Sequence, residues 1–387
     1  MKLTGRDIVC VGFADWDSEL RTNQHHLMSR LARENRVLFV ESLGLRQPQL
    51  SSKDLSRIVR RLKRGLSPPR KVDGLHVLSP LVIPLHRYAV VRALNRRILP
   101  FLVARTARKL GMKAPLLWSY NPQAEVLIPA LGPSQVIYHC VDDVAAQKGV
   151  DAGSFRAAER RFAERADLVF ATSEPLASRL REFVPGTLTM PNVADTDLFA
   201  RALEDGPVDP GVAALPGPRI VFTGAIVATK LDVRLLLELA RSRRDWSFAL
   251  VGPIGAGDPS TDVSPLASEP NIHLLGLRPY EALPQVLRGA DAALIPYSLN
   301  ELTRSIFPMK VYEYLAAGLP VVSTPLPSLQ GVEGLVTADD APATAAAIER
   351  LLAEDGPQAR AERARIAEGH SWDARIDEIA EALNGRG

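Results

Sequence analysis

The segment from Ser305 to Val322 combines a helix start, a lysine and a glutamate on one face, and a buried strand. Pro308 suits the first turn of a helix and Gly318 suits its end, which predicts a helix of about three turns. The N-terminus of a helix favours a phosphate or diphosphate, because its N–H groups are unpaired and carry a partial positive charge. Lys310 and Glu313 lie three residues apart and share one face of this helix. The pattern indicates a nucleotide site in which Glu313 accepts hydrogen bonds from ribose hydroxyls. An ordinary amphipathic helix with a surface ion pair would show the same spacing.

Length and composition indicate a soluble globular protein of two domains. The chain has 387 residues, of which 46% are hydrophobic, and domains of about 100 to 200 residues are usual. No apolar run is long enough for a transmembrane helix, and the N-terminus does not resemble a signal peptide. We therefore expect a cytoplasmic protein. Cys10 and Cys140 lie in apolar runs and are expected to be small core residues.

The two halves of the chain carry opposite net charges. Residues 1–190 contain 30 Lys or Arg against 17 Asp or Glu, whereas residues 191–387 contain 17 against 27. Residues 46–113 are the most basic strip, with 17 Lys or Arg and two Asp. Aliphatic residues are interleaved with these cations, which suits the surface of an anionic membrane. A solvated helix face is the simpler alternative. Nucleic acid is the least favoured partner, because the residues interleaved with the cations are aliphatic rather than base-stacking aromatic residues.

Short apolar runs alternate with helical patterns along both halves, as in βαβ units with parallel sheets. A Pro- and Gly-rich stretch at 206–218 separates the two series. We therefore expect an α/β fold with two Rossmann-like domains and a ligand in the cleft between them. The predicted strands are 8–13, 37–40, 75–78, 116–118, 136–141, 168–172, 219–223, 247–251, 272–275, 292–295 and 320–323, and the predicted helices are 19–33, 87–110, 154–166, 231–242, 280–289, 309–317 and much of 341–387.

Several stretches in this order resemble the retaining glycosyltransferases of the GT-B fold. The resemblance covers nearly the whole chain and rests on the stretches 166–173, 190–195, 222–225, 248–253, 271–276, 290–296 and 305–322. The stretches 138–143 and 308–316 resemble, more narrowly, the bacterial branch that builds cell-surface polysaccharides and glycolipids. The resemblance implies an acceptor-binding domain at 1–195 and a nucleotide-sugar-binding domain at 196–371. A C-terminal helix at 372–387 is expected to pack on one of these two domains through Trp372.

The resemblance implies a donor site in the second domain. Glu313 matches the glutamate that holds the ribose, and the loop of Thr303, Ser305, Ile306 and Phe307 matches the one that cradles the diphosphate. Preorganised N–H donors would stabilise the charge that builds up on the leaving nucleotide. The family places a phosphate-binding lysine near the position of Lys230, after the strand end at Gly224, and Lys310 is the alternative cation. The side chain of Arg278 and the backbone beside it match a place that faces the base.

One position departs from the family pattern. Many relatives carry an acidic residue near the sugar, eight positions before the ribose-binding glutamate, where this chain has Ser305. Glu301 is the nearby acidic residue that would replace it if the loop were arranged differently. An arginine that often precedes the lysine at 230 is also missing, since residues 225–229 read Ala-Ile-Val-Ala-Thr.

In the first domain, relatives place a histidine or aspartate near the anomeric centre at the end of the strand 136–141. Asp142 fits best by register, Asp143 is next, and His139 is the third candidate, with a buried core histidine as its alternative. The loop that ends the first strand offers acceptor contacts from Asp15, Trp16, Arg21 and Gln24. The indole of Trp16 would either stack on a sugar ring or anchor the loop. We expect metal-independent chemistry without a cofactor, because no metal-binding spacing is present.

These features favour a retaining glycosyltransferase. Its donor would be a nucleoside diphosphate sugar and its acceptor a cell-envelope polysaccharide, a glycolipid or another glycan, reached from the inner face of the membrane. A nucleotide-sugar epimerase of the same architecture is an alternative that would need no acceptor. A non-catalytic homologue that binds nucleotide sugar is another, motivated by Ser305 and by the missing arginine.

Overall fold

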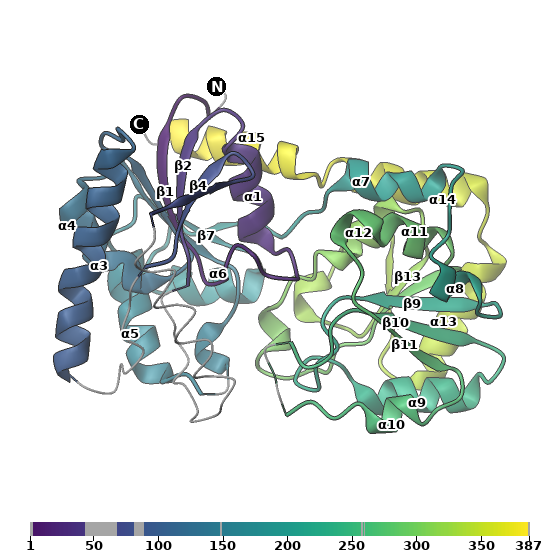
Figure 1. Ribbon diagram of the computed structural model, residues 1–387. Coiled ribbons are helices and arrows are strands. Elements are labelled where there is room, and N and C mark those ends of the chain that lie inside the picture. The colour runs from purple at the N-terminus through teal and green to yellow at the C-terminus, as the bar shows by residue number, and fades with distance from the viewer. Residues whose placement is uncertain are drawn as a thin grey trace. The chain divides into compact units, whose positions relative to one another are not determined.

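The computed structural model describes residues 3–42, 68–80, 89–147, 149–256, 258 and 260–385. The chain divides into two compact units, one formed by Met1–Pro191 with Ile376–Gly387 and the other by Asn192–Arg375. The boundaries expected from the sequence, after 195 and after 371, each differ from this division by four residues. Both units are α/β domains (Figure 1). Among the helices in the described ranges, none is long and apolar enough to cross a membrane.

The first unit contains an eight-stranded sheet in the order β3-β4-β2-β1-β5-β6-β7-β8. All neighbouring strands are parallel except β3 and β4, which pair antiparallel. The strands are β1 Asp7–Val11, β2 Arg36–Val40, β3 Arg70–Val72, β4 Leu75–Leu78, β5 Leu116–Ser119, β6 Val136–Cys140, β7 Leu168–Ala171 and β8 Leu188–Thr189. The helices are α1 Asn23–Leu31, α3 Ala89–Lys109, α4 Ile128–Leu131, α5 Ala152–Ala163 and α6 Glu174–Arg181, with 3₁₀ turns η1 Pro122–Leu127 and η2 Val144–Ala146.

The second unit contains a parallel six-stranded sheet in the order β11-β10-β9-β12-β13-β14. The strands are β9 Arg219–Thr223, β10 Ser247–Val251, β11 Ile272–Gly276, β12 Ala292–Ile295, β13 Val321–Ser323 and β14 Leu335–Thr337. The helices are α7 Thr196–Ala200, α8 Pro210–Ala213, α9 Val233–Ser242, α10 Ser264–Ala267, α11 Leu283–Arg288, α12 Lys310–Ala316, α13 Ala341–Ala353 and α14 Pro357–Glu368. The 3₁₀ turns are η3 Arg201–Leu203, η4 Tyr280–Ala282, η5 Thr303–Ser305 and η6 Pro327–Leu329. Helix α15, Trp372–Asn384, begins in this unit and ends in the first.

The strands form where the sequence has short apolar runs, because both faces of a parallel sheet are covered by helices. Residues 292–295 of β12 and 168–171 of β7 are buried throughout. In the second unit α9 packs with α10 and α13, while α12 packs with α7 and α14 (Figure 1). Side-chain caps fix three helix starts, since Asp151, Asp232 and Asp340 accept backbone N–H groups in the first turns of α5, α9 and α13. The sequence prediction of two Rossmann-like domains with parallel sheets is confirmed, apart from the antiparallel β3.

Candidate functional site

Helix α12 begins with backbone N–H groups that have no acceptor among the described residues. Pro308 precedes the helix and has no N–H to leave unpaired. Within the part of the chain that the structure describes, the N–H groups of Phe307, Met309 and Lys310 donate no hydrogen bond. Such donors at a helix start are a suitable environment for an anion, because the helix dipole adds a partial positive charge. The observed α12 has seven residues and is therefore shorter than the predicted helix.

Glu313 lies one turn into α12 and its carboxylate is nearly buried, with 6% of the residue exposed. No hydrogen bond or ion pair to this carboxylate comes from any described residue. Burial raises the pKa of Glu313 to about 7; the nearby Lys310 opposes this shift and Asp195 adds to it. A buried carboxyl group without a partner is costly to a fold, so its presence suggests a ligand that donates hydrogen bonds.

Lys310 places its ammonium group near two aromatic rings, those of Phe222 in β9 and of Tyr297 after β12. Its Nζ lies 5.5 Å from the ring centroid of Phe222 and 6.0 Å from that of Tyr297, which are favourable cation–π distances. Burial lowers the pKa of Lys310, but Tyr297, Tyr314 and Glu313 outweigh it, and the pKa lies above its ordinary value. Lys310 forms no ion pair with Glu313 or any other carboxylate in the described ranges. Lys310 and Glu313 therefore do not neutralise each other through an ion pair, and Tyr297 is the hydrogen-bond partner of the ammonium group.

The loops after β9 and β10 pack together beside Lys310. The N–H of Gly224 donates to Val251 O at 2.8 Å, and an added Cβ at Gly252 would lie 1.9 Å from Gly224 O. Only glycine permits this approach of two backbones. The β9 loop continues to Lys230, whose carbonyl accepts the N–H of Ser298 at 2.8 Å. The Lys230 side chain is half-buried, and no described residue forms an ion pair or hydrogen bond with its ammonium group.

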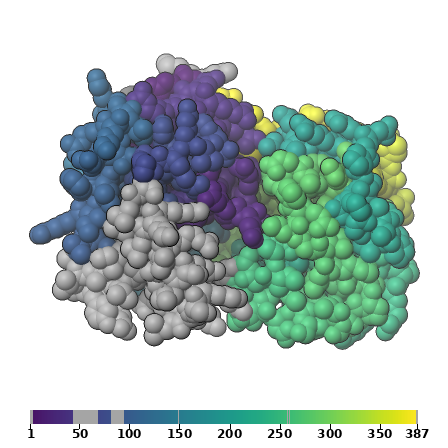
Figure 2. All heavy atoms as spheres, viewed as in Figure 1, coloured from purple at the N-terminus to yellow at the C-terminus, as the bar shows by residue number. Residues whose placement is uncertain are grey.

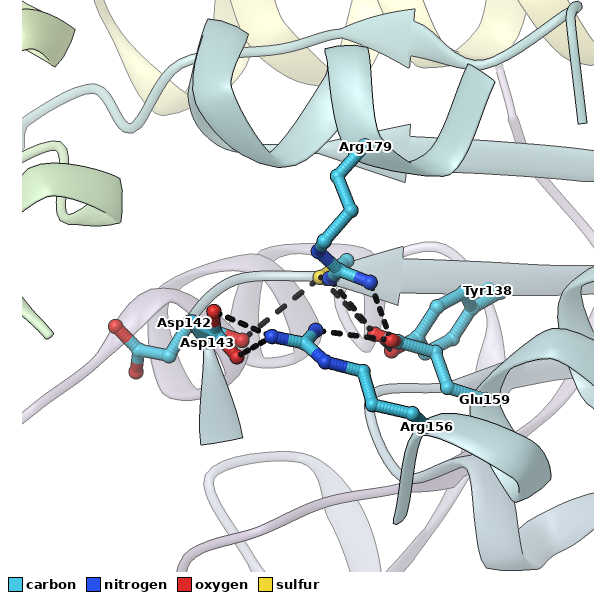
Figure 3. Close-up of polar contacts among 7 residues, drawn as sticks. Tyr138, Asp142, Asp143, Arg156, Glu159 and Arg179 are labelled. Atoms are coloured by element: carbon cyan, nitrogen blue, oxygen red, sulfur yellow. Dashed lines mark hydrogen bonds and ion pairs between the residues drawn. The ribbon is translucent and has the colours of Figure 1, made fainter. Parts of the chain in front are cut away.

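The carboxyl end of β6 in the first unit leads into a charged cluster (Figure 3). Arg156 holds both carboxylate oxygens of Asp143 at 2.6 Å and donates to Glu159 at 3.3 Å. Glu159 also accepts from Arg179 at 2.6 and 3.1 Å and from the hydroxyl of Tyr138 at 2.8 Å. Two carboxylates thus face two guanidinium groups, a balanced arrangement that fixes the orientation of Asp143.

Comparison with known proteins connects the second unit to a family. Residues 217–354, which run from before β9 into α13 and include α12, match the family model described as glycosyl transferases group 1. The second unit is a glycosyl transferases group 1 domain. The "Putative teichuronic acid biosynthesis glycosyltransferase TuaH" of Bacillus subtilis (strain 168) is 26% identical over 390 residues, which cover 96% of this chain and 95% of that protein.

Solved structures of low sequence identity share the fold of the whole chain. The Anabaena protein HepE in complex with UDP-glucose is 16% identical with a TM-score of 0.66, covering 98% of this chain and 99% of that one. Sucrose-phosphate synthase from Thermosynechococcus elongatus is 17% identical with a TM-score of 0.64, covering 98% of both chains. The chain therefore has the GT-B fold and is a glycosyltransferase of this type.

In this glycosyltransferase the loop 303–307 offers fewer free donors than the sequence suggested. Thr303 locks the loop internally, since its N–H donates to Asn300 Oδ1 at 3.0 Å and its hydroxyl to Ser298 O. Ile306 is buried, and its N–H is bonded to Thr303 O at 3.1 Å. Ser305 is buried and also has a partner. Phe307 is therefore the residue of this loop whose N–H remains open, and the neighbouring donors come from the helix start.

Arg278 is engaged within the protein. Its guanidinium donates to Asp209 at 2.6 and 3.3 Å and to the carbonyl of Leu275 at 2.7 Å. This geometry therefore does not support the predicted contact between the Arg278 side chain and a nucleotide base. The exposed carboxylate of Glu301 lies in the turn before η5.

The three candidates of the first unit have different surroundings. His139 is buried and stacks on Tyr120 at 5.0 Å between ring centroids, with Trp118 and Phe170 each 5.8 Å away. This is the environment of a core residue. Asp143 is bound by Arg156, whereas Asp142 is half-buried and points away from Arg156 (Figure 3).

Two of the predicted acceptor contacts anchor the loop after β1 instead. Trp16 is buried; its N–H donates to Glu41 at 2.8 Å and its indole Nε1 to Asp73 at 3.1 Å. Gln24 is buried and accepts the N–H of Phe13 at 3.0 Å. Of the two alternatives for Trp16, the structure favours the loop anchor, because its ring packs on His25 and Phe39. The other two predicted acceptor contacts, Asp15 and Arg21, are partly exposed. Nη1 of Arg21 lies 3.7 Å from Oδ2 of Asp73.

Glu159 was not predicted, although the sequence contains a signal for it. Phe155, Glu159 and Phe162 are spaced four and three residues apart, so the glutamate lies on the apolar face of α5. A single acid on such a face must find buried partners. Arg179 of the next helix and Tyr138 of β6 provide them.

The Gly224→Ala variant is expected to weaken donor binding. The new Cβ would lie 2.7 Å from Cε and Nζ of Lys310 at a φ of +120°, so the ammonium group must move and the backbone is strained. We expect a stability loss of about 1–3 kcal/mol from the strain and a several-fold weaker affinity for UDP or a related nucleotide in calorimetry.

Gly331→Ala is the matched control for this strain. Gly331 also has a positive φ, +77°, but its Cβ would meet nothing within 4 Å. This variant should lose stability while its nucleotide affinity stays unchanged. Equal nucleotide affinities in the native protein, Gly224→Ala and Gly331→Ala would contradict the placement of a ligand beside Lys310.

Proposed function

We propose that this GT-B enzyme is a retaining glycosyltransferase that transfers a sugar from a nucleoside diphosphate sugar. The observation that carries the proposal is the nearly buried, unpartnered Glu313 one turn inside an open helix start. A ribose would supply the hydroxyl donors that this carboxylate lacks. The diphosphate would meet the N–H groups of Phe307, Met309 and Lys310, with Lys310 or Lys230 as the cation. These donors would stabilise the leaving nucleotide without reorganising.

The acceptor is proposed to be a cell-envelope polysaccharide, a glycolipid or another glycan. The name of TuaH, which refers to teichuronic acid biosynthesis, supports a polysaccharide pathway. HepE, solved with UDP-glucose, supports a nucleotide sugar as the donor. We place the reaction in the cytoplasm at the inner face of the membrane. Residues 46–67 and 81–88 of the basic strip 46–113, which suggested a membrane surface, lie outside the described residues.

In the first unit, Asp143 or Asp142 would position the acceptor or stabilise positive charge near the anomeric carbon. Arg156 fixes the orientation of Asp143 through both carboxylate oxygens, as such a role needs. We propose that the chemistry proceeds without a metal ion. The test is a thermal-shift screen of UDP, GDP, dTDP and ADP with their sugar conjugates, followed by transfer assays with and without EDTA and analysis of the product anomer. A nucleotide that raises the unfolding temperature supports the donor site; conversion of the donor sugar without acceptor would instead favour an epimerase.

The affinity for the donor is expected to rise with pH. Burial raises the pKa of Glu313 to about 7, and ribose hydroxyls donate best to the ionised form. Below pH 7 binding must release a proton, which costs up to about tenfold in affinity per pH unit. The measurement is calorimetry with an intact nucleotide sugar, whose diphosphate has no group that titrates in this range. Glu313→Gln should remove the pH dependence; an equal slope in both proteins would assign it to another group.

A further inference from the structure

Helix α3 is the longest helix of the described chain and carries charge of one sign only. Residues 89–109 contain six Lys or Arg and no Asp or Glu. One face packs into the core of the first unit through Leu99, Val103 and Ala107. The charged residues must therefore lie on the remaining surface of the helix.

The outward face of α3 combines exposed apolar and basic side chains. Leu94 and Phe101 are 43% and 60% exposed, and Phe101 is the most exposed large apolar side chain in the described ranges. Arg97, Arg105 and Arg108 are exposed as well. These positions, with the half-buried Ile98, recur every three or four residues and so form one stripe along the helix. We call these six residues the α3 stripe. The surface of α3 lies in the blue part of the first unit in Figure 2.

The described part of the chain supplies no counter-charge to the cations of the α3 stripe. No carboxylate among the described residues forms an ion pair with Arg97, Arg105 or Arg108, and Arg108 donates only to the carbonyl of Ala104 in its own helix. Helix α5 shows the contrast, because its exposed Arg160 pairs with Glu164 at 2.8 Å. Unpaired arginines beside an exposed phenylalanine favour a partner that is both anionic and apolar.

We propose that the α3 stripe binds an anionic lipid bilayer. Leu94, Ile98 and Phe101 would enter the boundary between headgroups and acyl chains, while Arg97, Arg105 and Arg108 contact lipid phosphates. A second copy of the chain is a poor occupant, because two such helices would bring cations against cations. Nucleic acid would use the arginines but would leave two of the three apolar side chains, which are aliphatic, without a function.

This surface lies in the first unit and its test does not depend on the donor site. The full chain is incubated with vesicles of phosphatidylcholine alone or of equal parts phosphatidylcholine and phosphatidylglycerol, and bound protein is separated by flotation. We expect binding to the anionic vesicles only. Raising the salt from 0.1 M to 1 M should release the protein, because the screening length falls from about 10 Å to about 3 Å.

Two variants separate the apolar and the electrostatic contributions. Phe101→Ser should lower the vesicle partition coefficient about tenfold or more, since it removes a phenyl ring from the interface. Arg97→Gln combined with Arg105→Gln should lower it roughly thirtyfold, at about fivefold for each cation near the surface. Both changes are on exposed positions, so circular dichroism and the unfolding temperature should stay unchanged.

Matched controls lie on the second unit. Leu203→Ser replaces an apolar side chain of similar exposure to Leu94, 43%, and Arg234→Gln removes an exposed arginine. Neither should change vesicle binding. Glu313→Ala should also leave it unchanged, so that failure of the donor site and failure of the α3 stripe give different results.

Several outcomes would overturn the proposal. Vesicle binding that survives both α3 variants would assign it to another part of the chain. A dimer that Phe101→Ser dissociates would show that a second copy covers the stripe. Binding to single-stranded DNA that requires the arginines but not Phe101, without binding to vesicles, would identify a nucleic-acid surface.

Discussion

Glu313→Ala is expected to lower the affinity for a nucleoside diphosphate sugar at least about tenfold, because charge-assisted hydrogen bonds contribute about 1.5–3 kcal/mol each. The carboxylate is nearly buried and accepts nothing from the described protein, so its hydrogen-bonding capacity is available to a ligand. Calorimetry with the nucleotide identified by thermal shift measures the effect. Glu238→Ala, on the exposed face of α9, is the control and should bind normally. Unchanged affinity in Glu313→Ala would remove the basis of the proposed donor site.

The carboxylate of Glu313, which is expected to strengthen donor binding, should lower the stability of the unliganded protein. The folded pKa of Glu313 is about 7, whereas a glutamate in an unfolded chain titrates near 4.3. Between these values the folded state holds a proton that the unfolded state has released, so stability falls as the pH rises from about 4 to 7. The full cost, roughly 4 kcal/mol at about 1.4 kcal/mol per pKa unit, is present above pH 7.

Glu313→Gln should therefore stabilise the unliganded protein at about pH 8 and change little at about pH 5. Urea unfolding at the two pH values measures the difference. A residue that destabilises the free fold but strengthens ligand binding is typical of a binding site. A variant less stable than the native protein at high pH would mean that the carboxylate has a structural partner.

Much of the fold could be predicted because apolar runs and helix signals are local. The strands β4, β9, β10 and β12 begin and end at the predicted residues. The strands β3, β8 and β14 were missed, since they have only two or three residues and are partly exposed, so they show no apolar run. Local patterns of this kind decide which elements form, but carry less information on short edge strands.

The roles of single side chains were harder to predict, because they depend on partners far along the chain. Trp16 follows a strand end in a loop, where the sequence suggests either a sugar contact or an anchor. Glu41 and Asp73 decide the question, at separations of 25 and 57 residues. Arg278 was assigned to a base by resemblance, yet Asp209, 69 residues before it, holds its guanidinium. Glu313 differs, because its position in a helix start is itself a local pattern.

Glu159→Ala is expected to destabilise the first unit by about 3–5 kcal/mol, the usual cost of removing one partner from a buried ion pair. The side chain of Glu159 is 1% exposed, and its loss leaves Arg156, Arg179 and Tyr138 without their shared acceptor. Hydrogen exchange of peptides from β6, α5 and α6 measures the effect locally, with the sheet of the second unit as internal reference. The control is Glu164→Ala on the same helix, which removes an exposed ion pair and should cost less than about 1 kcal/mol.

Glu159→Gln separates the structural contribution of this residue from its influence on Asp143. Glutamine keeps the shape and an acceptor for Tyr138, but it removes the charge that holds Arg156 and Arg179. Arg156 would then be restrained by Asp143 alone, and the carboxylate of Asp143 would lose its fixed orientation. If Asp143 acts near the anomeric centre, kcat should fall while the affinity for the donor, bound by the second unit, stays the same. A variant with full activity and reduced stability would confine Glu159 to a structural role and favour Asp142.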